Sequence, residues 1–315
     1  MALVPLVALP MLLLAVAVIL QLARSDSVGR REAIAYSAKS IQGAVDTQLE
    51  KLMAIGRIFS VSPSLERGDL GEFRRETEQA MQGVKDIWIV VADPAGQQLI
   101  NLGVPAGAPL ARRSPEGIAA QTRAFESKKP EVSNVFTGIY RKRPIVTVEI
   151  PTFHDDIPLY VVSVATDVTK FLDLLSREQI PEGWLSGILD RRGDFVARTR
   201  DYERTVGKPA AAGWRAIMHR DGLFEFPVVE GDTIVAANVV SPLSGWAIGV
   251  GANEALFEAP LQRALWEMAL AAGVAALLGL FAAAIAARRL REETTSTTPL
   301  QTTNNVRAPA SGNHD

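Results

Sequence analysis

The sequence contains no cysteine and only three histidines among its 315 residues. A domain without cysteine needs no oxidative folding, and a chain of this length can fold on its hydrophobic cores alone, which fits an exported protein. The histidines, His154, His219 and His314, lie far apart and belong to no H-x-x-x-H, G-x-S-x-G or Gly-rich phosphate-loop motif. We therefore expect no enzyme activity, no catalytic residue and no cofactor.

The sequence has no large excess of charge of either sign, since the net charge is −2. Neither this charge nor any sequence motif suggests a nucleic-acid partner. His154 stands beside Asp155 and Asp156 between two apolar runs, which leaves two interpretations, a metal-ligand cluster or a solvated hairpin turn. We favour the turn, and we interpret Asp190 and Asp194 likewise as turn residues rather than paired catalytic carboxylates.

Two long stretches contain no charged side chain, residues 1–22 and 268–287. Each meets the requirement of about 20 residues for crossing a bilayer. We predict transmembrane helices at 1–22 and 264–287. A cleaved signal peptide is the alternative for the first, but its apolar run is too long and lacks a basic front and a small-residue exit.

Basic residues near these stretches give conflicting orientations. Arginines 288, 289 and 291 follow the second stretch, and two glutamates precede it, which places the C-terminus inside the cell. Arginines 24, 30 and 31 follow the first stretch and argue the opposite. We rely on the second stretch, so the long middle region lies outside the cytoplasm. The polar segment 288–315 lacks apolar periodicity and is predicted to be a disordered cytoplasmic tail.

Two stretches nearly a hundred residues apart share one pattern, "ADPAGQQLIN" at 92–101 and "LDRRGDFVAR" at 189–198. In each, an Asp follows an apolar run, a Gly comes three residues later, and apolar residues then resume. Asp can bond the backbone two residues on, and Gly accepts the positive φ that a tight turn needs. Each stretch therefore predicts a β-hairpin.

The surroundings of the two hairpins recur as well. After the first come a helical segment near 116–128 and the runs "VSNVFTG", "RPIVTVEIPTF" and "PLYVVSVATD". After the second come a helical segment near 209–219 and "GLFEFPVV", "DTIVAANVVSP" and "GWAIGVGAN". Each half predicts a five-stranded antiparallel sheet with helices, so the fold class is α+β with modules at 63–175 and 176–254.

A long helix is predicted over 23–62, between the first transmembrane stretch and the first hairpin. Its apolar residues step by threes and fours, which is the spacing of one buried face: Ile34, Ala38, Ile41, Val45, Leu49, Leu52, Ile55 and Phe59. Part of this stripe packs on the modules, and we expect the rest, with the second transmembrane helix, to support a homodimer.

This order of anchor, long helix, two tandem sheets and second anchor resembles the double Cache (dCache) sensor region, built of PAS-like modules, of alphaproteobacterial sensor histidine kinases. The resemblance covers about residues 1–290, through stretches such as "SPSLERGDLGEF", "VVADPAGQQLINL" and "SPLSGWAIGVGAN". It implies a two-pass sensor in the bacterial inner membrane with residues 23–263 in the periplasm. The module at 63–175 would be membrane-distal, and the module at 176–254 membrane-proximal.

The resemblance also implies a small ligand against the distal sheet, such as an organic acid, an amino acid or an amine. Anionic groups favour an Arg fork, and ammonium groups favour a carboxylate with an aromatic wall. On this basis the candidate ligand-binding residues are Trp88, Tyr140, Arg141, Arg143 and Asp167. The alternatives are a core role for Trp88, a surface role for Arg143 and a helix-capping role for Asp167. The full Tyr/Arg/Trp motif of the amino-acid-binding branch does not align here.

No segment after residue 287 fits a HAMP module, a kinase, a cyclase or a chemotaxis rod. We therefore expect the output to lie on a separate kinase or cyclase, or the chain to be a remnant of a sensor kinase gene. A membrane-anchored interaction protein that senses no small molecule is the alternative function.

Overall fold

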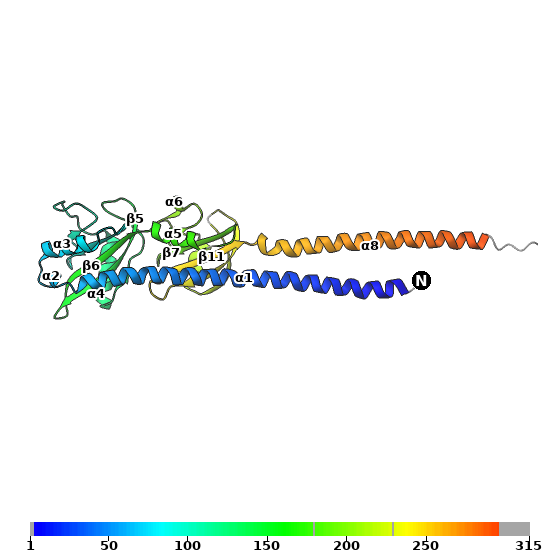
Figure 1. The fold of residues 1–315 in the computed structure, drawn as a ribbon, viewed down its shortest axis with the longest axis horizontal. Helices are drawn as coiled ribbons and strands as arrows, with labels where there is room; N and C mark the ends of the chain where they lie inside the picture. Colours follow the sequence, from blue (N-terminus) through cyan, green and yellow to red (C-terminus); the bar gives the residue numbers. More distant parts are fainter. Residues whose placement is uncertain (1–2, 179, 229, 296–315) are drawn as a thin grey trace, which may run out of the picture. The chain divides into compact units, whose positions relative to one another are not determined.

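The computed structural model describes residues 3–178, 180–228 and 230–295. The helices are α1 (Leu3–Ser60), α2 (Pro63–Glu66), α3 (Leu70–Ala80), α4 (Pro115–Ser127), α5 (Thr169–Arg177), α6 (Tyr202–Thr205), α7 (Ala212–Ile217) and α8 (Ala255–Thr295) (Figure 1). The chain divides into two units, of which Leu22–Pro260 is one and contains both β-sheets. The second unit consists of the N-terminal part of α1 and most of α8.

The first sheet has six strands and the order β2-β1-β6-β5-β3, with β4 also paired to β5. Its strands are β1 (Ile87–Ala92), β2 (Gln98–Asn101), β3 (Glu131–Val132), β4 (Phe136–Thr137), β5 (Pro144–His154) and β6 (Ile157–Asp167). We predicted five strands, because "VSNVFTG" reads as one. It forms two short strands because the backbone N–H groups of Asn134 and Val135 bond to carboxylates instead of to β5.

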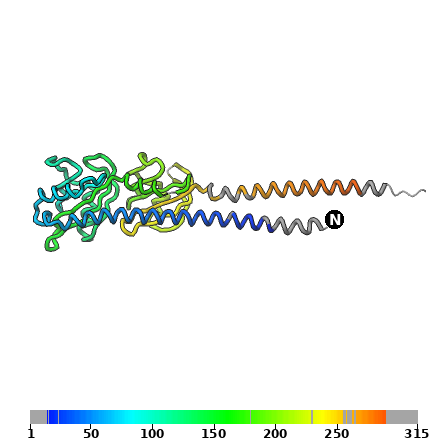
Figure 2. The backbone as a smooth tube through the Cα atoms, in the orientation of Figure 1, coloured from blue at the N-terminus to red at the C-terminus, as the bar shows by residue number. Residues whose placement is uncertain are grey.

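The second sheet has the five antiparallel strands that the sequence predicts, in the order β8-β7-β11-β10-β9. Its strands are β7 (Trp184–Leu189), β8 (Phe195–Arg198), β9 (Gly222–Pro227), β10 (Thr233–Val240) and β11 (Ala247–Asn253). Figure 2 follows the backbone from the first sheet, drawn in cyan to green, into the second, drawn in green to yellow. The helix predicted near 209–219 is shorter than expected and spans Ala212–Ile217.

The two predicted hairpin turns have the same geometry. Gly96 and Gly193 have φ values of 84° and 83°, a region that favours glycine. Each donates its N–H to the Asp three residues earlier, at 2.9 and 3.0 Å. The preceding strand is bulged in both cases, between Val91 and Ala92 and between residues 188 and 189. The duplicated sequence therefore builds a duplicated structure.

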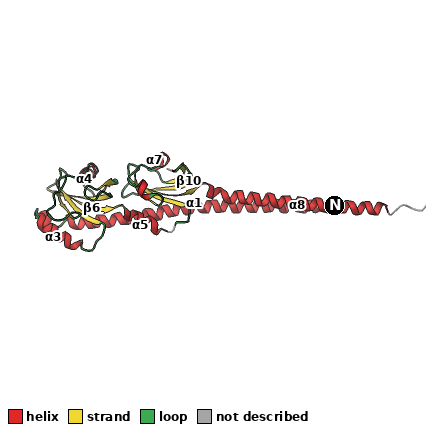
Figure 3. Cartoon of the chain, turned by 90° about the horizontal axis from the view of Figure 1, so that it is seen from above, coloured by secondary structure: helices red, strands yellow, loops and turns green. Residues whose placement is uncertain are grey.

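Helix α1 runs from Leu3 to Ser60 without a break and packs against both sheets (Figure 3). Asp46 accepts a hydrogen bond from Ser241 of the second sheet's β10–β11 turn, and Gly56 lies against Ile150 of the first sheet. The six stripe residues from Ile34 to Leu52 are fully buried within the chain. These six residues are therefore not available to a second copy of the chain, while a homodimer through the rest of the stripe and α8 stays a prediction.

One segment of the described residues, Leu265–Arg289 in α8, is long and apolar enough to cross a membrane. It overlaps the span predicted at 264–287. Most side chains of the span predicted at 1–22 lie outside the described residues, so that span stays a prediction. The helix continues to Thr295, so the disorder predicted from 288 is wrong for residues 288–295, where Arg, Leu and Glu favour helix. Residues 296–315 lie outside the described residues.

Candidate functional site

A cavity lies on the face of the first sheet that points away from α1. Strand alternation places Ile89 and Val91 of β1 in the core with α1, and Trp88 and Val90 on the opposite face. The empty space in and in front of this cavity is about 550 Å³, open solvent included. It is lined by Trp88, Val90, Gln98, Asn101, Gly103, Arg113, Ser114, Gly117, Phe136, Gly138, Ile139, Tyr140, Arg141, Ile145, Thr147, Ser163 and Ala165. The first turn of α4, the strands β1, β5 and β6, and the 136–141 segment thus converge on one hollow.

A buried ion pair lies at the inner wall of this cavity, with Arg113 in the lining and Glu149 behind it. The side chain of Arg113 is 5% exposed and that of Glu149 is 0% exposed. The guanidinium group contacts both carboxylate oxygens, at 2.5 and 2.9 Å. Thr147 and Ser163 donate their hydroxyl groups to the same oxygens. Such a bidentate, hydrogen-bonded pair is the arrangement in which a buried charge pair is tolerated.

Three of the five predicted site residues line the cavity. The guanidinium carbon of Arg141 lies 4.5 Å from the ring centroid of Trp88, a cation–π distance. The Tyr140 hydroxyl accepts a hydrogen bond from the Ala111 N–H at 2.6 Å, which ties the 136–141 segment to the stretch before α4.

The other two predicted residues do not line this cavity. Arg143 is exposed just before β5. Asp167 is buried at the end of β6, where its Oδ1 accepts a hydrogen bond from the Thr169 N–H at 3.0 Å. Asp167 thus takes the capping role that was the alternative in the sequence.

Sequence reasoning missed the ion pair itself. Arg113 lies in the polar stretch before α4, and Glu149 interrupts an apolar strand. A charged residue in the middle of a mostly apolar strand was the available signal, because lone buried carboxylates are rare and need a partner. Nothing in the sequence indicated that Arg113 is that partner.

The second sheet carries a tryptophan at the corresponding place. The N–H of Arg113 bonds to Gly96 in the first hairpin turn, and the N–H of Ala210 bonds to Gly193 in the second. Gly117 is the third residue of the helix that follows the first segment, and Trp214 is the third residue of the helix that follows the second. The first module thus has an arginine and a glycine where the second has an alanine and a tryptophan.

The Trp214 indole lies on the sheet itself. A Cβ atom on Gly249 would come within 2.4 Å of the ring, so only glycine fits there. Strand pairing shows which residues of the two sheets correspond. In the second sheet, Gly249 pairs with Gly187 on one side and with Asn238 on the other. In the first sheet, Ser163 pairs with Val90 and with Glu149 in the same way. The Trp214 Nε1 donates to Asn238 at 2.7 Å. The second module therefore fills with its own side chain the place that is hollow in the first.

Arg198, which pairs with Glu230, lines an apolar hollow beside Trp214 with an empty volume of about 410 Å³, open solvent included. The guanidinium donates to both carboxylate oxygens, at 2.7 and 2.8 Å. These hydrogen bonds lower the pKa of the Glu230 carboxyl below its ordinary value. Glu230 is 27% exposed, so this pair is more solvated than Arg113–Glu149.

The second hairpin turn inserts into the first module. The Asp190 carboxylate is fully buried and accepts hydrogen bonds from the N–H groups of Val135, Arg192 and Asp194, at 3.0, 2.8 and 3.0 Å. Burial raises the pKa of this carboxyl above its ordinary value, and the three backbone hydrogen bonds oppose the shift. A residue from the second module thus satisfies the backbone of the segment between β3 and β4.

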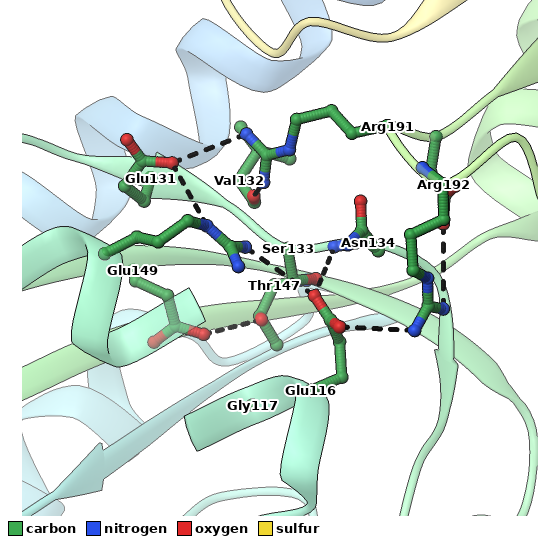
Figure 4. A network of polar contacts seen from close by, with 12 residues as sticks. Glu116, Gly117, Glu131, Val132, Ser133, Asn134, Thr147, Glu149, Arg191 and Arg192 are labelled. Carbon is green, nitrogen blue, oxygen red and sulfur yellow. Dashed lines mark hydrogen bonds and ion pairs between the residues drawn. The ribbon is translucent and has the colours of Figure 1, made fainter. Parts of the chain in front are cut away.

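Arg191 and Arg192 extend this contact (Figure 4). Arg191 donates to the Val132 carbonyl and pairs with Glu131 at 3.4 Å. Burial lowers the pKa of the Arg191 guanidinium. Arg192 donates to the Val135 carbonyl at 2.9 Å and pairs with Glu116 at 3.3 Å.

The network reaches two elements that line the cavity. Glu116 belongs to the first turn of α4, beside the lining residue Gly117, and it accepts the Asn134 N–H at 3.0 Å. The strand β4 follows directly and contributes Phe136 to the lining. We call this set of contacts around Asp190, Arg191 and Arg192 the interlock.

Solved structures that are similar to this chain include ligand-binding domains of chemoreceptors and the extracellular domain of a histidine kinase. The ligand-binding domain of the Campylobacter jejuni chemoreceptor Tlp3, in complex with L-valine, matches with a TM-score of 0.54 and 11% identity over 75% of this chain and 97% of that chain. The extracellular domain of the histidine kinase soHK1S-Z6 matches with a TM-score of 0.54 and 12% identity over 75% and 99%. The fold is that of a Cache-type sensor domain. No family model matches the sequence, and no curated protein matches it either.

The double Cache arrangement predicted from the sequence is therefore confirmed as a fold. The similar structures are sensory domains and not enzymes. His154 and Asp155 have side chains that are 73% and 89% exposed, and Asp155 and Asp156 have positive φ, as the hairpin interpretation expects. Among the described residues, no three His, Asp or Glu side chains come together as metal ligands would.

Proposed function

We propose that this protein is a membrane-anchored sensor that binds a small molecule in the cavity of its first module. The observation that carries the proposal is the asymmetry between two copies of one fold. The first copy has a polar, accessible hollow at the centre of its sheet, and the second copy has Trp214 there. One copy is thus suited to bind, and the other is suited to respond.

The similar structures support this function. Tlp3 has been solved with L-valine and with L-norvaline, and soHK1S-Z6 is the extracellular part of a kinase. A ligand that moves α4 or the 131–137 segment would act on the interlock, because Glu116, Val132 and Val135 are its partners in the first module. The signal would then pass through the turn at 190–193 into the second sheet, whose last strand, β11, leads into α8.

A ligand screen tests the proposal. We expect the full chain in detergent to gain several degrees in its unfolding temperature with at least one small metabolite, since a ligand that binds only the folded state stabilises it. Ala165→Leu, which adds bulk to the cavity floor, should abolish that gain while leaving a cooperative transition.

Hydrogen exchange on the same sample gives a second readout. The ligand should slow exchange at the Val135 amide and in the 190–193 turn. A library without any stabilising compound, or a gain that Ala165→Leu leaves intact, would contradict a sensor with this site and favour an interaction protein.

We also propose that residues 23–263 lie in the periplasm, with the first module farther from the membrane. The proposal rests on the arginines that follow the span Leu265–Arg289. Along α1, Asp46 contacts the second module and Gly56 the first, so the helix passes the second module before it reaches the first.

Reporter fusions check this topology. Alkaline phosphatase fused after Gly251 should be active, because the enzyme folds only outside the cytoplasm, and fused after Arg291 it should be inactive. The reverse pattern would place both modules in the cytoplasm.

A further inference from the structure

The charges that face the first-module cavity are positive. From this we propose that the ligand is a small organic carboxylate that carries no ammonium group. The inference rests on the proposed function and assigns the chemical class of the ligand to the same site. It differs from the amino acids that occupy the similar Tlp3 structures.

Arg141 supplies the accessible charge. Its side chain is exposed to the solvent side of the cavity, and its guanidinium stacks on Trp88 at 4.5 Å. No carboxylate in the described part of the chain lies within 4.0 Å of it, whereas Asp86, on the same side, pairs with Lys170 at 3.0 Å. A guanidinium that lies over an aromatic ring without a carboxylate partner has N–H groups left for the carboxylate of a ligand.

Arg113 adds donors deeper in the cavity. Its two terminal nitrogens hold Glu149 and Ser163, but its Nε takes part in none of these contacts. Gly117 keeps the space beside this nitrogen open, since a Cβ atom there would lie 3.1 Å from Nε. The Arg113 Nε–H is therefore available to an acceptor that enters the cavity.

The uncharged lining groups are also arranged to donate. The Asn101 side-chain N–H donates to the side-chain amide oxygen of Gln98 at 2.7 Å. The NH₂ group of Gln98 therefore points away from Asn101. The Ser114 oxygen accepts from the Gly117 N–H, so its own O–H remains a donor. A carboxylate only accepts hydrogen bonds, and it would match these groups.

An ammonium group finds no carboxylate among the lining residues. Glu149 lies behind the lining, is 0% exposed, and already has two donors on each of its oxygens. Asp167, the carboxylate that the sequence suggested, caps Thr169 instead. Placing an ammonium group beside Arg113 and Arg141 would bury an unpaired charge next to like charges, which is strongly unfavourable.

The rest of the lining suits a short apolar remainder. Val90, Ile145, Ala165 and Phe136 form a continuous apolar cluster with the Trp88 ring. The carboxylate would point toward Arg141 and Arg113, and the hydrocarbon part would lie on the floor formed by β1, β5 and β6.

Matched pairs of probes test the ligand class. Calorimetry on the full chain in nanodiscs would compare propionate with alanine, 3-methylbutanoate with valine, and succinate with aspartate, since each pair differs only by the α-amino group. We expect at least one carboxylate to bind about tenfold or more tightly than its amino counterpart. Loss of one partner of a buried guanidinium–carboxylate pair costs roughly a factor of 30 or more, and Arg141 is partly solvated, so Arg141→Gln should weaken that carboxylate about tenfold.

Arg143→Gln is the matched control, because Arg143 is an exposed arginine nearby that does not line the cavity. It should change the affinity by less than twofold. Amino acids that bind as tightly as the carboxylates, or no binding by any carboxylate probe, would overturn the ligand class and leave the sensor function standing. Carboxylate binding that Arg141→Gln leaves unchanged would move the ligand elsewhere and overturn the proposed site as well.

Discussion

Replacing Asp190 by alanine is expected to lower the free energy of unfolding by about 3 kcal/mol. The carboxylate is fully buried, and its removal leaves the N–H groups of Val135, Arg192 and Asp194 without their acceptor. Each buried donor left unsatisfied costs about 1–3 kcal/mol, and the relief of burying a charge offsets part of the sum. Urea unfolding of the full chain in detergent, followed by tryptophan fluorescence, measures the change.

The duplicated turn supplies a matched control for this measurement. Asp93 holds the same position in the first hairpin, but it accepts a single exposed hydrogen bond from the Gln97 N–H. Asp93→Ala should therefore cost about 1 kcal/mol. Equal losses in the two variants would show that Asp190 acts only within its own turn and would contradict its role in the interlock.

Glu149→Gln is expected to destabilise the ligand-free protein by about 3–5 kcal/mol. The substitution keeps the shape of the side chain but leaves the Arg113 charge buried without a counter-charge. A carboxylate ligand could then take the place of Glu149 as the partner of Arg113. The stabilisation by a saturating carboxylate should therefore be larger in this variant than in the wild type.

Thermal unfolding with and without the best carboxylate probe measures both effects. The control is Glu230→Gln, which removes the partner of Arg198 in the second module. Glu230 is partly exposed, so the loss should be about 1 kcal/mol, and the carboxylate should stabilise this variant as it does the wild type. A Glu149→Gln protein as stable as the wild type would contradict a charged Arg113 at the cavity wall.

The strands were predictable because local pattern decides them. The runs "IWIVVA" and "WLSGIL" coincide with β1 and β7, each followed by an Asp and a Gly that make the turn. Apolar runs between turn residues form strands wherever a core is available, and these signals need no knowledge of distant residues. The segment 131–137 was mispredicted because its backbone bonds to Glu116 and Asp190, which are far away in the sequence.

Aromatic and arginine residues near the strands allowed part of the cavity lining to be predicted. Trp88, Tyr140 and Arg141 were identified because their residue types suit ligand binding and lie next to predicted strands. The residue type could not distinguish Arg143 from Arg141. The turn before β5 decides that Arg141 lines the cavity and that Arg143 does not. Asp167 was predicted at the end of its strand. Its side chain accepts a hydrogen bond at the start of α5, and this contact was not predictable from the strand.

The two-module α+β fold, the duplicated turn, the long helix and an apolar span in α8 were predictable from the amino-acid sequence, because periodicity and turn chemistry are local. The tertiary structure alone decided that the modules differ. Whether a sheet is hollow or filled depends on Arg113, Gly117, Glu149 and Trp214, which meet only after strands and helices from separate parts of the chain have packed. Burial also decides which charged residues must pair, because a buried carboxylate is stable only with the partner that folding brings to it.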